Sequence, residues 1–202
     1  MTITRLIITI AICFITLACS SVKAPNIKYQ KRFDFQSIQG YSLFPRDSKF
    51  SDFQNISDAL RNSVEIAIEQ VLDEQGLTYQ SLERADIIVG YYIVDRGRRG
   101  FVKYNKGVNF CQHCLKSYSS DSGRKTLNVK PGSLVLDMVD PVSKRSVWRS
   151  VYPLKIKFED NSREVQKKIR TAVAIMLEQY AVITATSALT LNVLSAKENA
   201  DV

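Results

Sequence analysis

A nearly uninterrupted run of β-branched and aromatic residues, Asp86-Ile-Ile-Val-Gly-Tyr-Tyr-Ile-Val-Asp95, constrains the fold more than any other part of this 202-residue chain. Apolar side chains stand at both odd and even positions of the run. A strand with this pattern buries both of its faces. We therefore expect residues 86–95 to form a central strand of a sheet that is covered on both sides.

Two segments have apolar residues at spacings of three and four, which is typical of amphipathic helices. The first is Ser57–Gln75, followed by Gly76, a residue that readily ends a helix. The second runs from about Ser162 to Tyr180, where Asn161 and Glu164 have the spacing of a capping box. We expect the apolar stripes of both helices to belong to the core.

Further strand patterns complete the predicted fold. Ser133–Val139 and Ser146–Tyr152 flank a turn sequence and should pair as a hairpin, and an earlier strand pair is expected in Arg32–Phe44. The order β–α–β–β–β–α predicts an α+β two-layer sandwich, with a mostly antiparallel sheet and two helices on one face. We assign residues 32–180 to this single domain and residues 181–202 to a C-terminal extension.

The start of the chain has the features of an export signal. The uncharged run from Leu6 to Ala18 is 13 residues long, and a membrane-spanning helix needs roughly 20. Its end resembles the bacterial lipobox, in which the chain is cut before a cysteine and a lipid is attached to the thiol, although Thr16 stands where Leu is usual. We expect residues 1–18 to be a lipoprotein signal peptide, Cys19 to be lipidated, and residues 19–31 to be a tether. An uncleaved anchor and an ordinary signal peptide are the alternatives.

Lipidation of Cys19 would hold the protein at a membrane. Two acyl chains on the thiol and one, such as palmitate, on the amine hold a protein stably at a bilayer. Ser20 rather than Asp follows Cys19, which favours sorting to the outer membrane in enteric bacteria. The sequence therefore predicts a protein of the cell envelope, anchored in the outer membrane and facing the periplasm.

Several short motifs in their order along the chain resemble one family of Gram-negative lipoproteins. Besides the lipobox and the first amphipathic helix, they are Tyr41-Ser-Leu-Phe44, Ala85-Asp-Ile-Ile-Val89, Leu134-Val-Leu-Asp-Met-Val-Asp140 and Val147-Trp-Arg149. This set is similar to domain of unknown function 4136 over roughly residues 33–180. The resemblance implies no catalytic residues. The chain departs from the family pattern in residues 96–130 and after Tyr180.

The excess of positive charge is concentrated in residues 96–130. This segment holds nine Lys and Arg against Asp121 alone, a local charge of +8, and the whole chain also carries +8. Its interspersed glycines suggest a basic, cysteine-containing insertion shaped as a long hairpin. The charges either keep this hairpin soluble or bind an anionic partner. The candidate contact residues are Arg96, Arg98, Arg99, Lys103, Lys106, Arg124 and Lys125.

The compartment limits which anions are available. For a protein held at a membrane they are anionic lipids, lipopolysaccharide, acidic cell-wall polymers and acidic protein surfaces. Nucleic acid has suitable chemistry but belongs to the wrong compartment. We expect the lipid on Cys19 to provide the membrane contact and the basic segment to provide the second one.

Two cysteines, Cys111 and Cys114, remain after processing and allow three readings. A structural disulfide is natural in an oxidising compartment. Thiol–disulfide exchange is the second reading, although redox Cys-x-x-Cys pairs sit at a helix N-terminus and the neighbouring sequence here looks like strand or loop. The third reading is metal binding together with His113, the only histidine, but zinc sites need a fuller ligand set.

Sequence motifs of the common enzyme classes are missing. The chain has no Gly-x-Ser-x-Gly elbow, no phosphate-binding Gly-Lys-Ser/Thr loop and no Gly-x-Gly-x-x-Gly turn. We therefore predict a non-enzymatic protein without cofactor or metal, lipid-anchored in the envelope, which binds an anionic or protein partner through its basic segment. A periplasmic redox module that uses Cys111 and Cys114 is the alternative.

Overall fold

The computed structural model describes residues 24–46, 54, 56–97, 99–117, 129–178 and 180. The expected signal peptide, Cys19 and the C-terminal extension lie outside these residues. The strands are β1 (Asn26–Tyr29), β2 (Gly40–Leu43), β3 (Thr78–Tyr79), β4 (Ile87–Ile93), β5 (Lys116–Ser117), β6 (Ser133–Asp140) and β7 (Arg145–Pro153). The helices are α2 (Asp58–Glu74), α3 (Arg99–Gly107) and a C-terminal helix over residues 162–178.

All seven strands join in one sheet, in the order β3-β2-β4-β6-β7-β1-β5. The pairs β4–β6, β6–β7, β7–β1 and β1–β5 are antiparallel, and β2 runs parallel to both β3 and β4. The expected hairpin is confirmed as β6–β7. The fold is thus α+β with a mostly antiparallel sheet.

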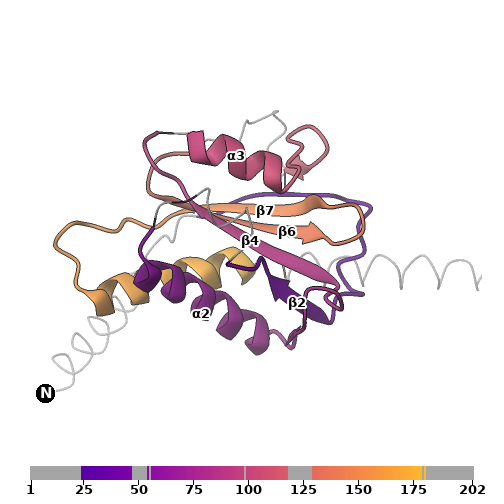
Figure 1. Ribbon diagram of the computed structural model, residues 1–202, viewed down its shortest axis with the longest axis horizontal. Helices are drawn as coiled ribbons and strands as arrows, with labels where there is room; N and C mark the ends of the chain where they lie inside the picture. Colours follow the sequence, from indigo (N-terminus) through magenta and orange to yellow (C-terminus); the bar gives the residue numbers. More distant parts are fainter. Residues whose placement is uncertain are drawn as a thin grey trace, which may run out of the picture.

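The central strand β4 is covered on both faces, as its sequence predicts. Ile87, Val89 and Tyr91 belong to one apolar cluster with α2 and the C-terminal helix, whereas Ile88 and Tyr92 belong to a second cluster with α3. Figure 1 shows α2 and the C-terminal helix beneath the sheet and α3 above it. No helix among the described residues combines the length and the apolar character that a membrane span requires.

Both predicted helices are confirmed, and their N-terminal ends are capped by side chains. The Ser57 hydroxyl accepts the Leu60 amide at 3.3 Å, and Gly76 after α2 adopts a φ of 84°. At the second helix the Asn161 amide donates to the Glu164 carboxylate at 2.8 Å, and the Glu164 amide donates to the Asn161 side chain at 3.1 Å. This reciprocal pair is the capping box that the sequence predicts.

The two-layer expectation is wrong because a third helix, α3, covers the other face of the sheet. Residues 99–107 were expected within a basic hairpin, since glycines and charges dominate their composition. Tyr104 and Val108 nevertheless turn inward at helical spacing and are fully buried against β4, β6 and β7. A central strand that is apolar on both faces needs such a cover.

The first described residues also differ from expectation. Residues 26–29, which we placed in the tether, form β1 between β7 and β5. Ile27 is buried in the main core, so this short segment is part of the domain. Within residues 32–44 a single strand, β2, forms in place of the expected pair. Four residues are too few to show the alternation by which a strand is recognised.

Candidate functional site

Helix α3 is attached to the sheet by a buried hydrogen bond. The Tyr104 hydroxyl donates to Oδ2 of Asp137 on β6 at 2.8 Å. Gly90 of β4 lies beneath this contact, and a Cβ there would stand 3.3 Å from the Tyr104 hydroxyl and 3.2 Å from the Phe44 ring. Burial and the neighbouring Asp137 raise the pKa of Tyr104 well above its ordinary value, so the phenol stays a neutral donor.

Asp137 forms a buried ion pair with Arg149 of β7. The two side chains are fully buried, with Nε to Oδ1 and Nη2 to Oδ2 distances of 2.8 Å. The Ser146 hydroxyl donates to the same carboxylate. Both carboxylate oxygens therefore have several donors, as a buried charge requires.

The guanidinium of Arg149 extends this network to α3 and the segment after it. Its Nη1 donates to Oδ1 of Asn105 at 2.7 Å, and its Cζ lies 3.5 Å from the centre of the Phe110 ring. Because all of its charged groups are paired and buried, the network fixes the position of α3 and is not open to a ligand. The network thereby holds the exposed face of α3 in a fixed position on the sheet.

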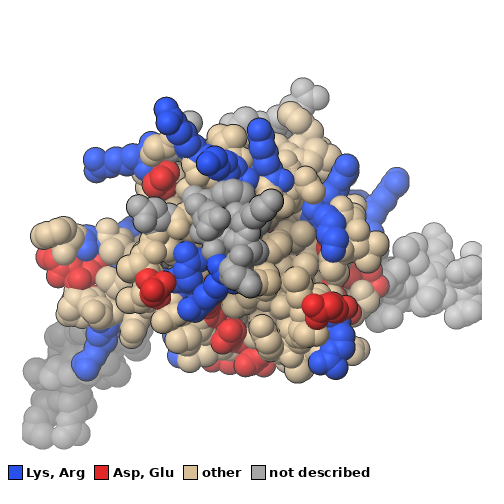
Figure 2. All heavy atoms as spheres, viewed as in Figure 1, with Lys and Arg blue, Asp and Glu red and all other residues tan. Residues whose placement is uncertain are grey.

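The exposed face of α3 carries three of the predicted binding residues. Arg99, Lys103 and Lys106 are spaced by four and three residues and are all exposed. Among the described residues, none lies within ion-pair distance of these three side chains. Figure 2 shows Lys and Arg side chains projecting from the side of the molecule on which α3 lies. We call these three residues the basic face of α3.

The other predicted binding residues are only partly placed by the structure. Arg96 is exposed in the turn before α3. Arg98, Arg124 and Lys125 lie outside the described residues. The structure adds basic residues that the sequence analysis did not select, because they come from distant segments: Lys31 and Arg32 after β1, Lys116 on β5 and Arg145 on β7.

Cys111 and Cys114 lie in a turn between α3 and β5, with their Sγ atoms 1.95 Å apart, the separation of a disulfide bond. A surface hollow on one side is lined by α3, the disulfide and the β6–β7 turn, and includes Lys106 and Arg145. A second hollow, next to Cys114, is lined by Gln30, Lys31, Arg32 and Lys116. The disulfide therefore lies between two basic hollows.

Around Cys111 and Cys114 the described residues differ from those of a typical redox or metal centre. Cys111 follows the C-terminal end of α3, whereas the dipole that activates a redox thiol acts at a helix N-terminus. Within the described part of the chain, no three His, Cys, Asp or Glu side chains gather to hold a metal ion. His113 is exposed.

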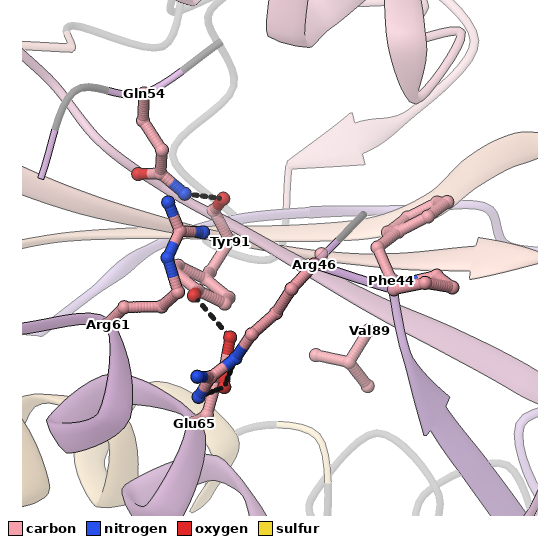
Figure 3. Close-up of a pocket in the computed structure, with 9 residues that line it drawn as sticks. Phe44, Arg46, Gln54, Arg61, Glu65, Val89 and Tyr91 are labelled. Carbon is pink, nitrogen blue, oxygen red and sulfur yellow. Dashed lines mark hydrogen bonds and ion pairs between the residues drawn. The ribbon is translucent and has the colours of Figure 1, made fainter. Parts of the chain in front are cut away.

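A further polar cleft opens between β2, β4 and α2, and the sequence analysis missed it. In Figure 3 the carboxylate of Glu65 lies between Tyr91 and Arg46, while Gln54 contacts the backbone of β4. The Tyr91 hydroxyl donates to Oε1 of Glu65 at 2.7 Å, and Nε of Arg46 donates to Oε2 at 2.9 Å. The one signal in the sequence is an acid, Glu65, on the apolar stripe of α2.

This cleft is narrow and its groups already bind one another. The Gln54 side chain donates to the Tyr91 carbonyl and accepts the Ile93 amide, both at 3.0 Å. It thereby pairs with the stretch of β4 beyond the end of its pairing with β2. Burial, followed by the hydrogen bond to Glu65, raises the pKa of Tyr91. We interpret the cleft as a structural cluster that closes the edge of β4.

Comparisons with known proteins give the fold and the family. The crystal structure of a DUF4136 family protein from Bacteroides thetaiotaomicron is similar with a TM-score of 0.52 and 13% sequence identity, over 81% of this chain and 99% of that one. A PDZ domain protein from Parabacteroides distasonis matches at a TM-score of 0.38 and 13% identity, over 71% of this chain and 32% of that one. No curated protein matches the chain significantly.

The family model described as "Domain of unknown function (DUF4136)" matches residues 25–180. The matched range begins one residue before β1 and ends at the last described residue of the C-terminal helix, so it coincides with the folded domain. The resemblance expected from the short motifs is confirmed, and the chain belongs to the DUF4136 family.

Proposed function

We propose that this protein is a non-enzymatic, lipid-anchored protein of the cell envelope that binds an anionic partner through the basic face of α3. Residues 1–18 direct export, and Cys19 carries the lipid that holds the domain at the outer membrane, facing the periplasm. The partner is a lipid phosphate, lipopolysaccharide, an acidic cell-wall polymer or an acidic protein surface. No cofactor or metal takes part.

One observation carries the proposal of a binding surface. Arg99, Lys103 and Lys106 are exposed on one side of a helix whose other side is fixed to the sheet by the Tyr104–Asp137–Arg149 network. No described side chain neutralises them. A rigid row of unpaired positive charges attracts an anionic surface without first having to be ordered.

A matched pair of charge reversals tests this surface. The first variant replaces Arg99, Lys103 and Lys106 by Glu. The control replaces Arg163, Lys167 and Arg170, which have the same spacing and are exposed on the C-terminal helix. Both change the net charge equally, so a difference between them reports the location of the charge and not its amount.

Binding is measured with purified lipopolysaccharide, anionic lipid vesicles and cell-wall sacculi, and by co-purification of envelope proteins at low salt. We expect the α3 reversal to abolish binding to one of these partners and the control to retain it. Equal binding by both variants would show that α3 is not the surface. Raising the salt concentration should weaken the wild-type interaction, because exposed charges are screened.

The anchor is tested separately by the intact mass of the mature protein and by membrane fractionation. We expect a chain that begins at Cys19 and carries acyl chains, and a Cys19→Ser variant that is released from the membrane. A native protein that retains residues 1–18, or that carries no lipid, would refute this part of the proposal.

A further inference from the structure

Four segments of the domain meet at one end of the sheet. Asn26, at the start of β1, pairs with Val151 near the end of β7. Ser133, at the start of β6, pairs with Pro153, and Ile93, at the end of β4, pairs with Leu134. We call this the β1-entry end. The turn between β6 and β7 lies at the opposite end.

The short chain between Cys19 and Ala24 determines which end of the sheet lies nearer to a lipid on Cys19. The chain from Cys19 to Ala24 spans at most about 18 Å when fully extended. The eight residues of β6 separate the two ends of the sheet by about 26 Å. A lipid on Cys19 would therefore hold the β1-entry end closer to the bilayer than the opposite end.

An exposed aromatic side chain stands at the β1-entry end. Phe158 has a relative exposure of 106%, and Ile156 is 38% exposed, in the loop that follows β7. Figure 1 shows this loop on the same side of the molecule as the start of α3. Moving a large apolar side chain from water into an apolar or interfacial environment lowers the free energy.

The loop is held in a shape that presents Phe158 outward. The Asp160 carboxylate accepts the Lys157 amide at 2.7 Å and forms an ion pair with Lys168. The Lys168 ammonium also donates to the Lys155 carbonyl at 3.1 Å, and Lys155 has a φ of 53°. The polar groups of the loop thus fix its backbone and do not turn the aromatic ring toward the core.

Basic residues lie on the segments that meet at this end of the sheet. Arg96 and Arg99 follow β4, Lys130 precedes β6, and Lys155 and Lys157 flank Ile156; all five are exposed. Acids are also present, since Lys157 lies 3.4 Å from Glu159 and Asp160 is paired with Lys168. Among the described residues, none forms an ion pair with Arg96, Arg99, Lys130 or Lys155. Aromatic residues beside Lys and Arg are the side chains that settle in the headgroup region of a bilayer.

We propose that the β1-entry end faces the bilayer, with Phe158 and Ile156 in the headgroup region and with Arg96, Arg99 and Lys130 bound to the phosphates of anionic lipids. This inference rests on the lipid anchor of the proposed function and adds an orientation to it. Helix α3 then leads away from the membrane, because its C-terminal end lies at the opposite end, where the Val108 carbonyl accepts the Ser146 amide. Lys103 and Lys106 then lie farther from the bilayer than Arg99 and remain available to a second partner.

The orientation is tested by tryptophan quenching in the full mature, lipidated protein. Phe158→Trp places a reporter at the proposed contact, and Val142→Trp places one in the β6–β7 turn, where Val142 is 88% exposed. The native Trp148 is fully buried and gives a constant background. Both substitutions replace exposed side chains, so the fold should tolerate them.

Each protein is reconstituted in vesicles of phosphatidylethanolamine and phosphatidylglycerol, with and without brominated acyl chains. We expect bromolipid to reduce the added fluorescence of the Phe158→Trp variant and to leave that of the Val142→Trp variant unchanged. Replacing phosphatidylglycerol by phosphatidylcholine should reduce the quenching, since the headgroups are then neutral overall. Absence of quenching in the Phe158→Trp variant, or equal quenching in both variants, would overturn the orientation.

The mass of the purified protein separates this inference from the proposal on which it depends. An unlipidated native chain overturns the anchor and the orientation together. A lipidated chain whose Phe158→Trp variant is not quenched overturns the orientation alone. A charge reversal of Lys103 and Lys106 should leave the quenching intact, because the orientation assigns the lipid contact to Arg96, Arg99 and Lys130; loss of quenching in that variant would contradict this assignment.

Discussion

Asp137 and Arg149 form the ion pair to which Tyr104 and Asn105 of α3 are hydrogen-bonded. Their ion pair is fully buried, and the carboxylate also accepts hydrogen bonds from Tyr104 and Ser146. Removing one partner leaves the other charge buried without compensation. Breaking this pair therefore lowers the free energy of unfolding much more than breaking an exposed pair, whose charges return to water.

We expect Asp137→Asn to lower the free energy of unfolding by about 3–5 kcal/mol, measured by urea denaturation. The matched control is Arg170→Ala, which breaks the exposed pair with Glu74 and should cost less than about 1 kcal/mol. The double variant Asp137→Leu, Arg149→Met should recover part of the loss, because it removes both charges. Similar costs for Asp137→Asn and Arg170→Ala would contradict the role assigned to the buried pair.

Gln54 illustrates a single side chain that completes a sheet. Its amide takes the place of a neighbouring strand for the Tyr91 carbonyl and the Ile93 amide. We expect Gln54→Ala to lower the free energy of unfolding by about 1–3 kcal/mol, since two backbone groups lose a partner. Hydrogen exchange at the Ile93 amide should become faster. An unchanged exchange rate there would show that another group replaces the Gln54 side chain.

Asp86 shows how far a single residue could be predicted. The sequence places it at the start of the predicted central strand, and its Oδ2 accepts the amides of Gln39 and Gly40 at 3.0 and 2.7 Å. These amides lie at the start of β2, far from Asp86 in the sequence, so the partners of Asp86 could not be predicted. The pairing of Asp137 with Arg149 was not predicted, because it depends on the register between two strands.

At the scale of elements, periodicity was informative only where an element was long. The 17-residue helix α2, the C-terminal helix and the β6–β7 hairpin were all predicted. Helix α3 was missed because nine residues with two glycines show too little of the helical repeat. Strand β1 was missed because a four-residue strand has no detectable pattern, and it is recognisable only from its pairing with β7 and β5.

The disulfide belongs to the element that includes α3 and the turn after it. It closes a loop of only four residues, so it removes little entropy from the unfolded chain. We expect the double variant Cys111→Ser, Cys114→Ser to lower the free energy of unfolding by no more than about 2 kcal/mol. Its main effect should be faster hydrogen exchange in residues 105–116, where Phe110 contacts Arg149.

That prediction has a clear contrary outcome. The disulfide would instead support the whole sheet if its removal lowered the free energy of unfolding by well over about 2 kcal/mol and left hydrogen exchange in residues 105–116 unchanged relative to the rest of the domain. A reduced protein with the same exchange pattern as the oxidised one would show that Arg149 and Asn105 alone hold the turn in place.

At the scale of the whole molecule, buried tyrosines link stability to alkaline pH. Burial is the leading cause that raises the pKa of Tyr41, Tyr91, Tyr92, Tyr104 and Tyr180, the last to about 12. A raised pKa in the folded state means that the unfolded chain loses protons first as the pH rises. The resulting stability is complete below about pH 10 and is lost above it.

We expect the free energy of unfolding to fall above about pH 10, with Tyr104 alone contributing up to about 1.4 kcal/mol per pH unit. Tyr104→Phe should make this fall less steep, although it also removes the hydrogen bond to Asp137 at neutral pH. Denaturation curves recorded between neutral pH and the alkaline limit of folding measure both effects. An equal slope in the variant and the wild type would mean that Tyr104 ionises as readily in the folded state as in the unfolded one.

The place of β1 between β7 and β5 has a mechanical consequence. A force that pulls the chain out through the β1-entry end acts along the axis of β1, so the hydrogen bonds to both neighbouring strands resist it simultaneously. A strand at the rim of the sheet, pulled across its axis, would instead separate one bond at a time. The position of β1 therefore lets the domain bear tension applied from its N-terminal side, because many hydrogen bonds must break together before the strand is pulled out.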